Sequence, residues 1–154
     1  MKNLYILGIC IVLVSCSSLS NNTNVDEQKD KTFITPDRDT SKPVLSLIKK
    51  ARVAAKAGNL SQARADIERA IRIEPRNASL WHYLGKLSLL QKKYKDSINF
   101  ARKSNQLLSA ATSSASKKNE LARDNWRMVA HAKYQLGDID GAKQAQKKAN
   151  QLEK

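Results

Sequence analysis

Residues 58–85 read GNLSQARADIERAIRIEPRNASLWHYLG, and the order of residues in this stretch decides the fold class. Gly58-Asn59 predicts a turn followed by the start of a helix. Glycine tolerates the left-handed conformation that ends helices, and an asparagine side chain accepts hydrogen bonds from the free amides of the next helix. Small and bulky residues then recur at helical spacing, as at Ala63 and Ile67, until Pro75 interrupts the pattern. The stretch therefore predicts one helix, a break near the proline and the opening of another helix.

The same signals occur again further along the chain. Trp81, Leu84 and Gly85 open a second segment, Trp126 opens a third, and Gly137-Asp138 repeats the turn and cap. These offsets resemble the tetratricopeptide repeat, a helix–turn–helix unit of about 34 residues whose apolar stripe is buried only when neighbouring units stack. The resemblance implies an all-α fold of about three stacked repeats. The expected repeats cover residues 44–77, 78–111 and 123–154, within a folded domain at 44–154.

An insertion is expected between the second and third repeats. Trp81 and Trp126 lie 45 residues apart, which exceeds one repeat by about eleven residues, or about three helical turns. The additional residues, at about 112–122, either lengthen the flanking helices or form a loop rich in serine and alanine at 110–116. The sequence leaves both alternatives open.

The first residues have the pattern of an export signal. One cation, Lys2, precedes an apolar run of about eleven residues, which is too short for a stable transmembrane helix. Leu13-Val14-Ser15-Cys16 then resembles the lipobox of bacterial lipoproteins. The resemblance implies removal of residues 1–15 and acylation of Cys16, by palmitate among other chains. The serine at position 17 resembles the pattern for delivery to the outer membrane, facing the periplasm. The alternative is an ordinary cleaved signal with an incidental cysteine.

A polar segment separates this signal from the repeats. Residues 16–43 hold the cysteine and a stretch rich in serine, asparagine, threonine, aspartate and lysine without apolar periodicity. Such a segment cannot bury enough surface to offset its ordering entropy, which predicts a disordered tether. Its one apolar spot, Phe33-Ile34, either docks on the body or a partner, or simply belongs to a solvated linker.

The charge of the chain restricts its partners. There are 28 Lys and Arg residues against 14 Asp and Glu residues, a formal net charge of +14. This favours anionic partners such as acidic proteins or anionic envelope polymers. Nucleic acid is not expected, because the export signal directs the chain away from it and stacking aromatics are few.

The sequence holds no recognisable catalytic constellation. Both cysteines, Cys10 and Cys16, precede the folded part, which excludes a cysteine nucleophile or a cysteine-based zinc site there. His82 and His131 belong to different repeats and have no ligand-forming neighbours at metal-binding spacing. We therefore expect neither an enzyme nor a bound metal, and no cofactor apart from the lipid on Cys16.

The resemblance to tetratricopeptide proteins also implies where a partner binds. In these proteins the first helix of each repeat lines a concave groove, which here would be cationic and would suit an acidic or carboxylate-bearing peptide. The alternative is a solvated basic face without a partner. The expected groove residues are Arg52, Lys56, His82, Lys86, Arg127, His131 and Tyr134, with Ile48 and Leu89 as aliphatic members.

The layout of signal, tether and repeats resembles one group of outer-membrane lipoproteins. The block from Ile73 to His82, with Asn125-Trp126-Arg127 later, is similar to the Lpo-type lipoproteins, which activate penicillin-binding synthases of peptidoglycan. The resemblance implies a protein-interaction adaptor in the envelope, with such a synthase as partner. Lipoproteins of pilus or outer-membrane assembly share the layout, and direct binding of an anionic envelope polymer is a further alternative.

Overall fold

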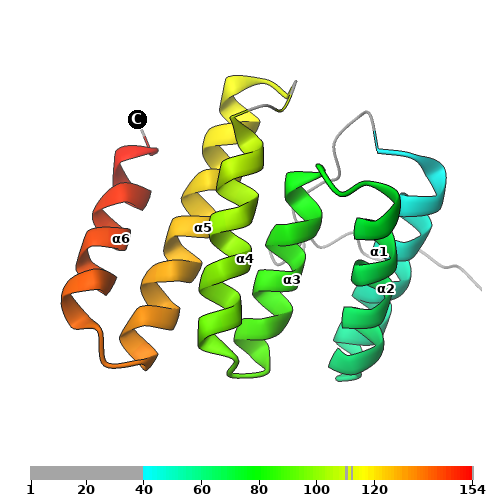
Figure 1. Ribbon diagram of the computed structural model, residues 1–154, viewed down its shortest axis with the longest axis horizontal. Helices are drawn as coiled ribbons and strands as arrows, with labels where there is room; N and C mark the ends of the chain where they lie inside the picture. The colour runs from blue at the N-terminus through cyan, green and yellow to red at the C-terminus, as the bar shows by residue number, and fades with distance from the viewer. Residues whose placement is uncertain (1–39, 110, 112, 154) are drawn as a thin grey trace, which may run out of the picture. The chain divides into compact units, whose positions relative to one another are not determined.

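The computed structural model describes residues 40–109, 111 and 113–153, and this part of the chain is helical without any strand (Figure 1). The expected signal, the lipidation site Cys16 and residues 16–39 of the expected tether lie outside the described residues. The helices are α1 (Lys42–Lys56), α2 (Leu60–Ile73), α3 (Ala78–Leu90), α4 (Tyr94–Leu108), α5 (Ala115–Gln135) and α6 (Ile139–Gln151).

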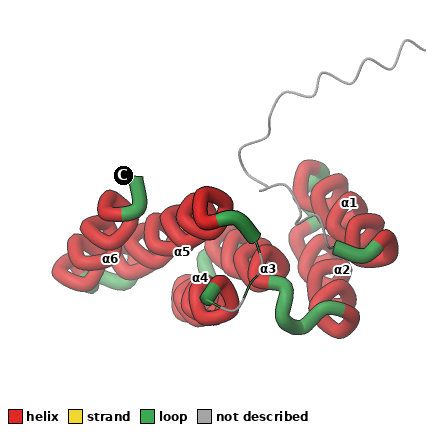
Figure 2. Tube along the Cα trace, turned by 90° about the horizontal axis from the view of Figure 1, so that it is seen from above, coloured by secondary structure: helices red, strands yellow, loops and turns green. Residues whose placement is uncertain are grey.

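The helices form three successive antiparallel pairs. Each helix packs against the next one along the chain, and α3 also packs against α5 (Figures 1 and 2). This arrangement confirms the expected all-α stack of three helix–turn–helix units. Helix α1 begins at Lys42. The expected end of the tether at residue 43 is therefore placed too late, because residues 42 and 43 already belong to the first helix.

Two of the three turns within the pairs have the expected chemistry. Gly58 and Gly137 adopt positive φ angles of 78° and 81°. Directly after them, the Asn59 side chain accepts a 3.1 Å hydrogen bond from the backbone of Gln62, and the Asp138 side chain accepts one of 2.9 Å from Gly141. The glycine-then-cap prediction is therefore confirmed in the first and third pairs.

The turn of the second pair departs from this rule. Lys92 occupies the corresponding place with φ 58°, the one positive φ of a non-glycine residue among the described residues. A side chain in this conformation crowds its own backbone at a cost of about 1 kcal/mol. We expect Lys92→Gly to raise the free energy of unfolding by about that amount in urea titrations. The matched Lys103→Gly, at an exposed position in the interior of α4, should lower it instead, because glycine is a poor helix former. A loss of stability in Lys92→Gly would contradict the strain argument.

The insertion between the second and third pairs mainly lengthens a helix. Helix α5 has 21 residues and begins at Ala115, six residues after Ser109 caps α4. Leu121 on the added turns is buried and forms a small cluster with Leu108 and Ala78. The extension therefore anchors α5 against the C-terminal end of α4 and the start of α3, and a short connection remains between α4 and α5.

Two larger clusters of buried side chains hold the pairs together. The first joins α1, α2 and α3 and consists of Val44, Ile48, Ala51, Ala63, Ile67, Ala70, Leu80, Tyr83, Leu84 and Leu87. The second joins α4, α5 and α6 and consists of Ile98, Ala101, Met128, Val129, Ala130, Ala132 and Ala145. Alanine is frequent in both, and its small side chain allows neighbouring helices to approach closely.

Candidate partner-binding site

A hollow of about 310 Å³ lies between α3 and α5, the first helices of the second and third pairs. Helix α5 contributes residues spaced by three and four positions, which places them on one face of the helix. Helix α3 contributes two residues three positions apart. The lining residues are Lys86, Leu89, Asp124, Arg127, Met128 and His131.

The charges around this hollow are partly compensated by acidic neighbours. Arg127 forms an ion pair with Glu153, just beyond the end of α6, and its guanidinium lies 3.8 Å from the Asp124 carboxylate. All three side chains keep solvent exposure, and exposed ion pairs contribute only about 0–1 kcal/mol. A carboxylate on a partner can therefore replace these contacts at little cost. Leu89 is half-buried and adds apolar surface beside the cations, whereas Met128 is only 5% exposed and belongs to the core.

Of the expected groove residues, Lys86, Arg127 and His131 meet in this hollow together with the aliphatic Leu89. The expectation for Ile48 is wrong, because its side chain is buried in the core. Tyr134 lies one turn beyond His131 and is 62% exposed, but it does not line the hollow. Arg52 and Lys56 lie on α1, outside it.

Arg52 is half-buried beside Tyr83. Burial raises the pKa of the Tyr83 phenol to about 12, and the nearby Arg52 charge opposes this rise. This part of the expected groove is therefore tied to the core formed by the first three helices. Lys56 is exposed in the last turn of α1.

The expectation that His82 lines the groove is wrong. Its side chain is 0% exposed, and its Nδ1 lies 2.7 Å from the Asn125 Oδ1 atom of α5. Burial lowers the pKa of His82 to about 3, with a smaller contribution from the charge of Lys86, so the imidazole is neutral. The extended α5 covers this position, so His82 acts within the core and not at the surface.

The sequence interpretation missed Asp124 and Met128 in this hollow. Asp124 precedes Arg127 by three positions and Met128 follows it directly, so helical spacing alone could have placed them on the same side of α5. The role of Asn125 had no comparable signal, because it depends on contacts with two other helices.

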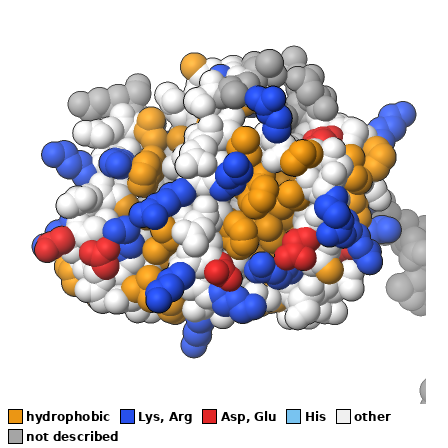
Figure 3. Space-filling view, in the orientation of Figure 1, with side chains coloured by type: hydrophobic (Ala, Val, Ile, Leu, Met, Phe, Trp, Pro, Cys, Tyr) orange, Lys and Arg blue, Asp and Glu red, His pale blue; other side chains and the backbone are white. Residues whose placement is uncertain are grey.

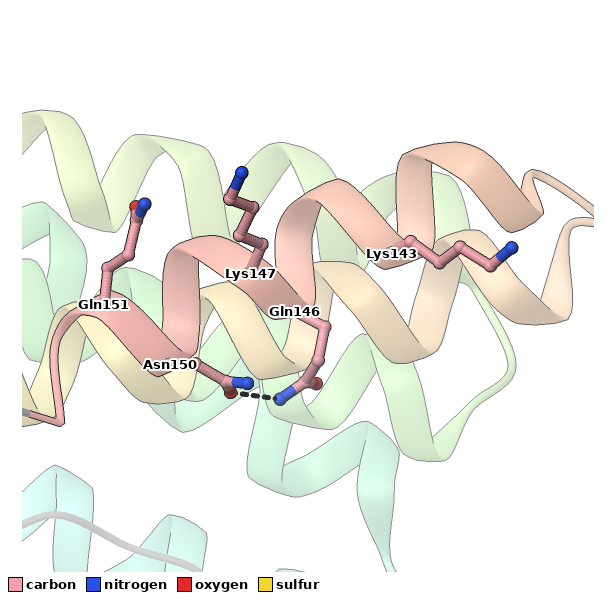
Figure 4. A pocket seen from close by; sticks show the side chains of 5 residues that line it. All are labelled: Lys143, Gln146, Lys147, Asn150 and Gln151. Atoms are coloured by element: carbon pink, nitrogen blue, oxygen red, sulfur yellow. Dashed lines mark hydrogen bonds between the residues drawn. The ribbon is translucent and has the colours of Figure 1, made fainter.

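A second, shallow hollow of about 470 Å³ runs along the exposed face of α6 (Figure 4). All of its lining residues come from this one helix, and Gln146 Nε2 donates a 2.8 Å hydrogen bond to Asn150 Oδ1. No aspartate or glutamate occurs between residues 141 and 152. The face thus presents ammonium and amide groups only. Its residues are Lys143, Gln146, Lys147, Asn150 and Gln151.

In the described part of the chain, no group of three or more His, Cys, Asp or Glu side chains is arranged to hold a metal ion. No helix within the same residues combines the length and apolar character needed to cross a membrane.

Comparison with known proteins identifies the first and third helix pairs. Residues 45–77 and 125–154 match the family model of the tetratricopeptide repeat. These two segments are tetratricopeptide repeats. The pair α3–α4 lies between them, outside the matched residues, and packs in the same stack. Tetratricopeptide domains are typical of non-enzymatic protein interactions.

Two solved structures are similar to this chain over more than two thirds of its length. The globular C-terminal domain of P. aeruginosa LpoP is 28% identical, with a TM-score of 0.64 over 71% of this chain and 97% of that one. The N-terminal domain of stress-induced protein-1 (STI-1) from C. elegans is 16% identical. Its TM-score is 0.63 over 77% of this chain and 100% of that one, which supports the fold alone. A search among curated protein sequences gave no match.

Proposed function

We propose that this chain is an outer-membrane lipoprotein, anchored through acylated Cys16 and facing the periplasm, that binds and activates a penicillin-binding synthase of peptidoglycan. Tetratricopeptide repeats and the LpoP-like fold support the general role of a protein-interaction adaptor. The main structural support for a binding site is the hollow between α3 and α5, where Lys86, Arg127 and His131 meet. The export signal, the lipobox and the Lpo-type resemblance support the finer assignment.

The chemistry of the hollow specifies the kind of segment that a partner would present. Arg127 lines the hollow, and its guanidinium forms exposed ion pairs with Asp124 and Glu153 that a carboxylate of the partner can replace. A guanidinium can bind a carboxylate through two parallel hydrogen bonds, which gives geometric specificity as well as energy. The half-buried Leu89 can contact an adjacent apolar side chain. We infer an acidic segment that carries at least one bulky apolar residue.

The test compares two variants that each remove two positive charges. The full-length lipoprotein in detergent micelles is titrated against a purified penicillin-binding synthase, and both the Kd and the rate of glycan polymerisation are measured. We expect Lys86→Ala/Arg127→Ala to weaken binding at least about tenfold and to reduce activation in parallel, because the charged contacts of the hollow are lost. The control Lys143→Ala/Lys147→Ala, on α6, should bind as the parent does.

The face of α6 supports a second candidate function, the direct binding of an anionic envelope polymer. Ammonium and amide groups without any intervening carboxylate suit the acidic groups and hydroxyls of a glycan. In that case, in a co-sedimentation assay with peptidoglycan sacculi, Lys86→Ala/Arg127→Ala should bind as the parent does and becomes the control. Lys143→Ala/Lys147→Ala would then bind less than the parent, and this difference would shrink as the salt concentration rises, because salt screens exposed charges. Unchanged synthase binding by both variants would refute the role of the hollow.

A further inference from the structure

A small aromatic patch lies apart from both hollows, where α3 passes between α2 and α4. We define this aromatic patch as Trp81 of α3, Phe100 of α4 and Arg64 of α2. The rings of Trp81 and Phe100 have centroids 6.0 Å apart, and the Arg64 guanidinium carbon lies 5.6 Å from the centre of the Phe100 ring. All three side chains are only half-buried, so each leaves part of its surface uncovered. In Figure 3 hydrophobic side chains gather in the region where Figure 1 places α3 between α4 and α2.

Local contacts hold this patch in place. Arg64 Nη1 donates a 3.3 Å hydrogen bond to Ser88 Oγ, and its Nε lies 2.8 Å from the Glu68 carboxylate. The indole of Trp81 donates through Nε1 to the backbone oxygen of Pro75, at 2.9 Å. The apolar surface is therefore presented in a fixed orientation, with its polar atoms already satisfied.

The chain enters the described domain beside this patch. Thr40 is 8% exposed, and its Oγ1 accepts a 3.4 Å hydrogen bond from Asn77 Nδ2. The backbone of Ser41 donates to Glu74 Oε1 at 2.8 Å, and Asn77 Nδ2 also donates to Glu74 Oε2 at 2.8 Å. Burial would raise the pKa of Glu74, but the hydrogen bonds from Ser41 and Asn77 outweigh it and lower this pKa. These bonds fix residue 40 against the loop between α2 and α3.

The same loop carries the contact of Trp81. Pro75, which accepts from the indole, and Asn77, which holds Thr40, are separated by a single residue. The apolar pair Phe33-Ile34 precedes Thr40 by six residues at its nearer end. Six residues span at most about 20 Å, which is enough to bring this pair from the fixed entry point onto the patch.

We propose that Phe33-Ile34 of this chain docks intramolecularly on the aromatic patch. Burial of two large apolar side chains against fixed aromatic rings is favourable, and the connection to Thr40 is short, so little loop-closure entropy opposes it. Docking would shorten the free part of the tether to the residues before Lys31. A ligand that takes the patch would release this segment and extend the reach of the repeats from the membrane.

Fluorescence of Trp81 tests this inference in the full-length lipoprotein in nanodiscs. The substitution Trp126→Phe leaves Trp81 as the only tryptophan. In this background we expect Phe33→Ala/Ile34→Ala to shift the emission to longer wavelength and to raise acrylamide quenching roughly twofold, because the indole loses its apolar cover. The control Val25→Ala changes an apolar residue of the same tether that lies farther from the entry point, and it should leave both signals unchanged.

A second measurement uses the chain with both tryptophans. Lys31 and Arg38 flank the apolar pair, and docking should slow trypsin cleavage after both residues relative to cleavage after Lys29. Phe33→Ala/Ile34→Ala should remove this protection. Equal quenching and equal cleavage in the parent and the double variant would overturn the proposal. Protection that grows with protein concentration would also overturn it, because the occupant would then be a second copy of the chain.

Discussion

Replacing Asn125 with alanine should lower the free energy of unfolding by about 3 kcal/mol, a large share of the roughly 5–15 kcal/mol typical of a domain. Asn125 is fully buried on α5 and accepts from the Nδ1 of His82 on α3 at 2.7 Å. Its Nδ2 donates to Ser104 Oγ and to Asn105 Oδ1 on α4, both at 2.8 Å. Ser104 in turn donates to the backbone oxygen of Ala78 at 2.8 Å. One side chain thus joins three helices.

The expected loss is large because alanine leaves the buried His82 without its partner and removes the link to α4. The buried Nδ1–H of His82 loses its acceptor, which costs about 1–3 kcal/mol, and the half-buried Asn105 Oδ1 loses a donor as well. The His82 Nε2 atom already has no hydrogen-bond partner among the described residues, so the ring has no second bond to rely on. Urea titration followed by circular dichroism measures the change.

The matched control is Asn119→Ala, which makes the same substitution at an exposed position of the same helix. Its effect should stay within about 0.5 kcal/mol. If Asn125→Ala proved as mild as Asn119→Ala, the hydrogen-bonded junction of α3, α4 and α5 would not be a major contributor to stability.

The contrast between turns and junctions shows how far the sequence could predict the fold. The turns at Gly58-Asn59 and Gly137-Asp138 depend on residues that are adjacent in the chain, so local chemistry was sufficient to predict them. The Asn125 junction joins residues 20 to 43 positions apart, and its partners become known only when the helices are packed. Helical periodicity could not distinguish a His82 that faces a partner from one that faces Asn125.

The candidate site was predictable to a similar extent. Lys86, Arg127 and His131 meet because the first helices of two successive pairs lie side by side, which follows from the repeat pattern. The compensation of Arg127 by Glu153 was not predictable, because it depends on where α6 ends relative to α5. The contacts of Ser41 with Glu74 and of Thr40 with Asn77 were not predictable either. They form only when α1 packs on α2.

The buried His82 should also make the domain sensitive to mild acid. Its ordinary pKa is 6.5, and burial together with the charge of Lys86 lowers it to about 3 in the folded state, while the hydrogen bond with Asn125 opposes the shift. Between these two values the unfolded chain binds a proton at this residue and the folded chain does not. The free energy of unfolding therefore keeps the full His82 contribution above pH 6.5 and loses it as the pH falls toward 3.

The expected slope is about 1.4 kcal/mol per pH unit in the middle of this range, or a loss of about 2 kcal/mol between about pH 7 and pH 5. Glu74 and Asp138 also have lowered pKa values, but carboxyl groups begin to contribute only below this interval, near their ordinary value of about 4. Urea titrations at several pH values measure the slope. His82→Gln should flatten it whatever its effect on stability at neutral pH, whereas His131→Gln, at an exposed position of α5, should preserve it. A slope that survives in His82→Gln would mean that another group titrates, and that the His82–Asn125 contact does not control the response to acid.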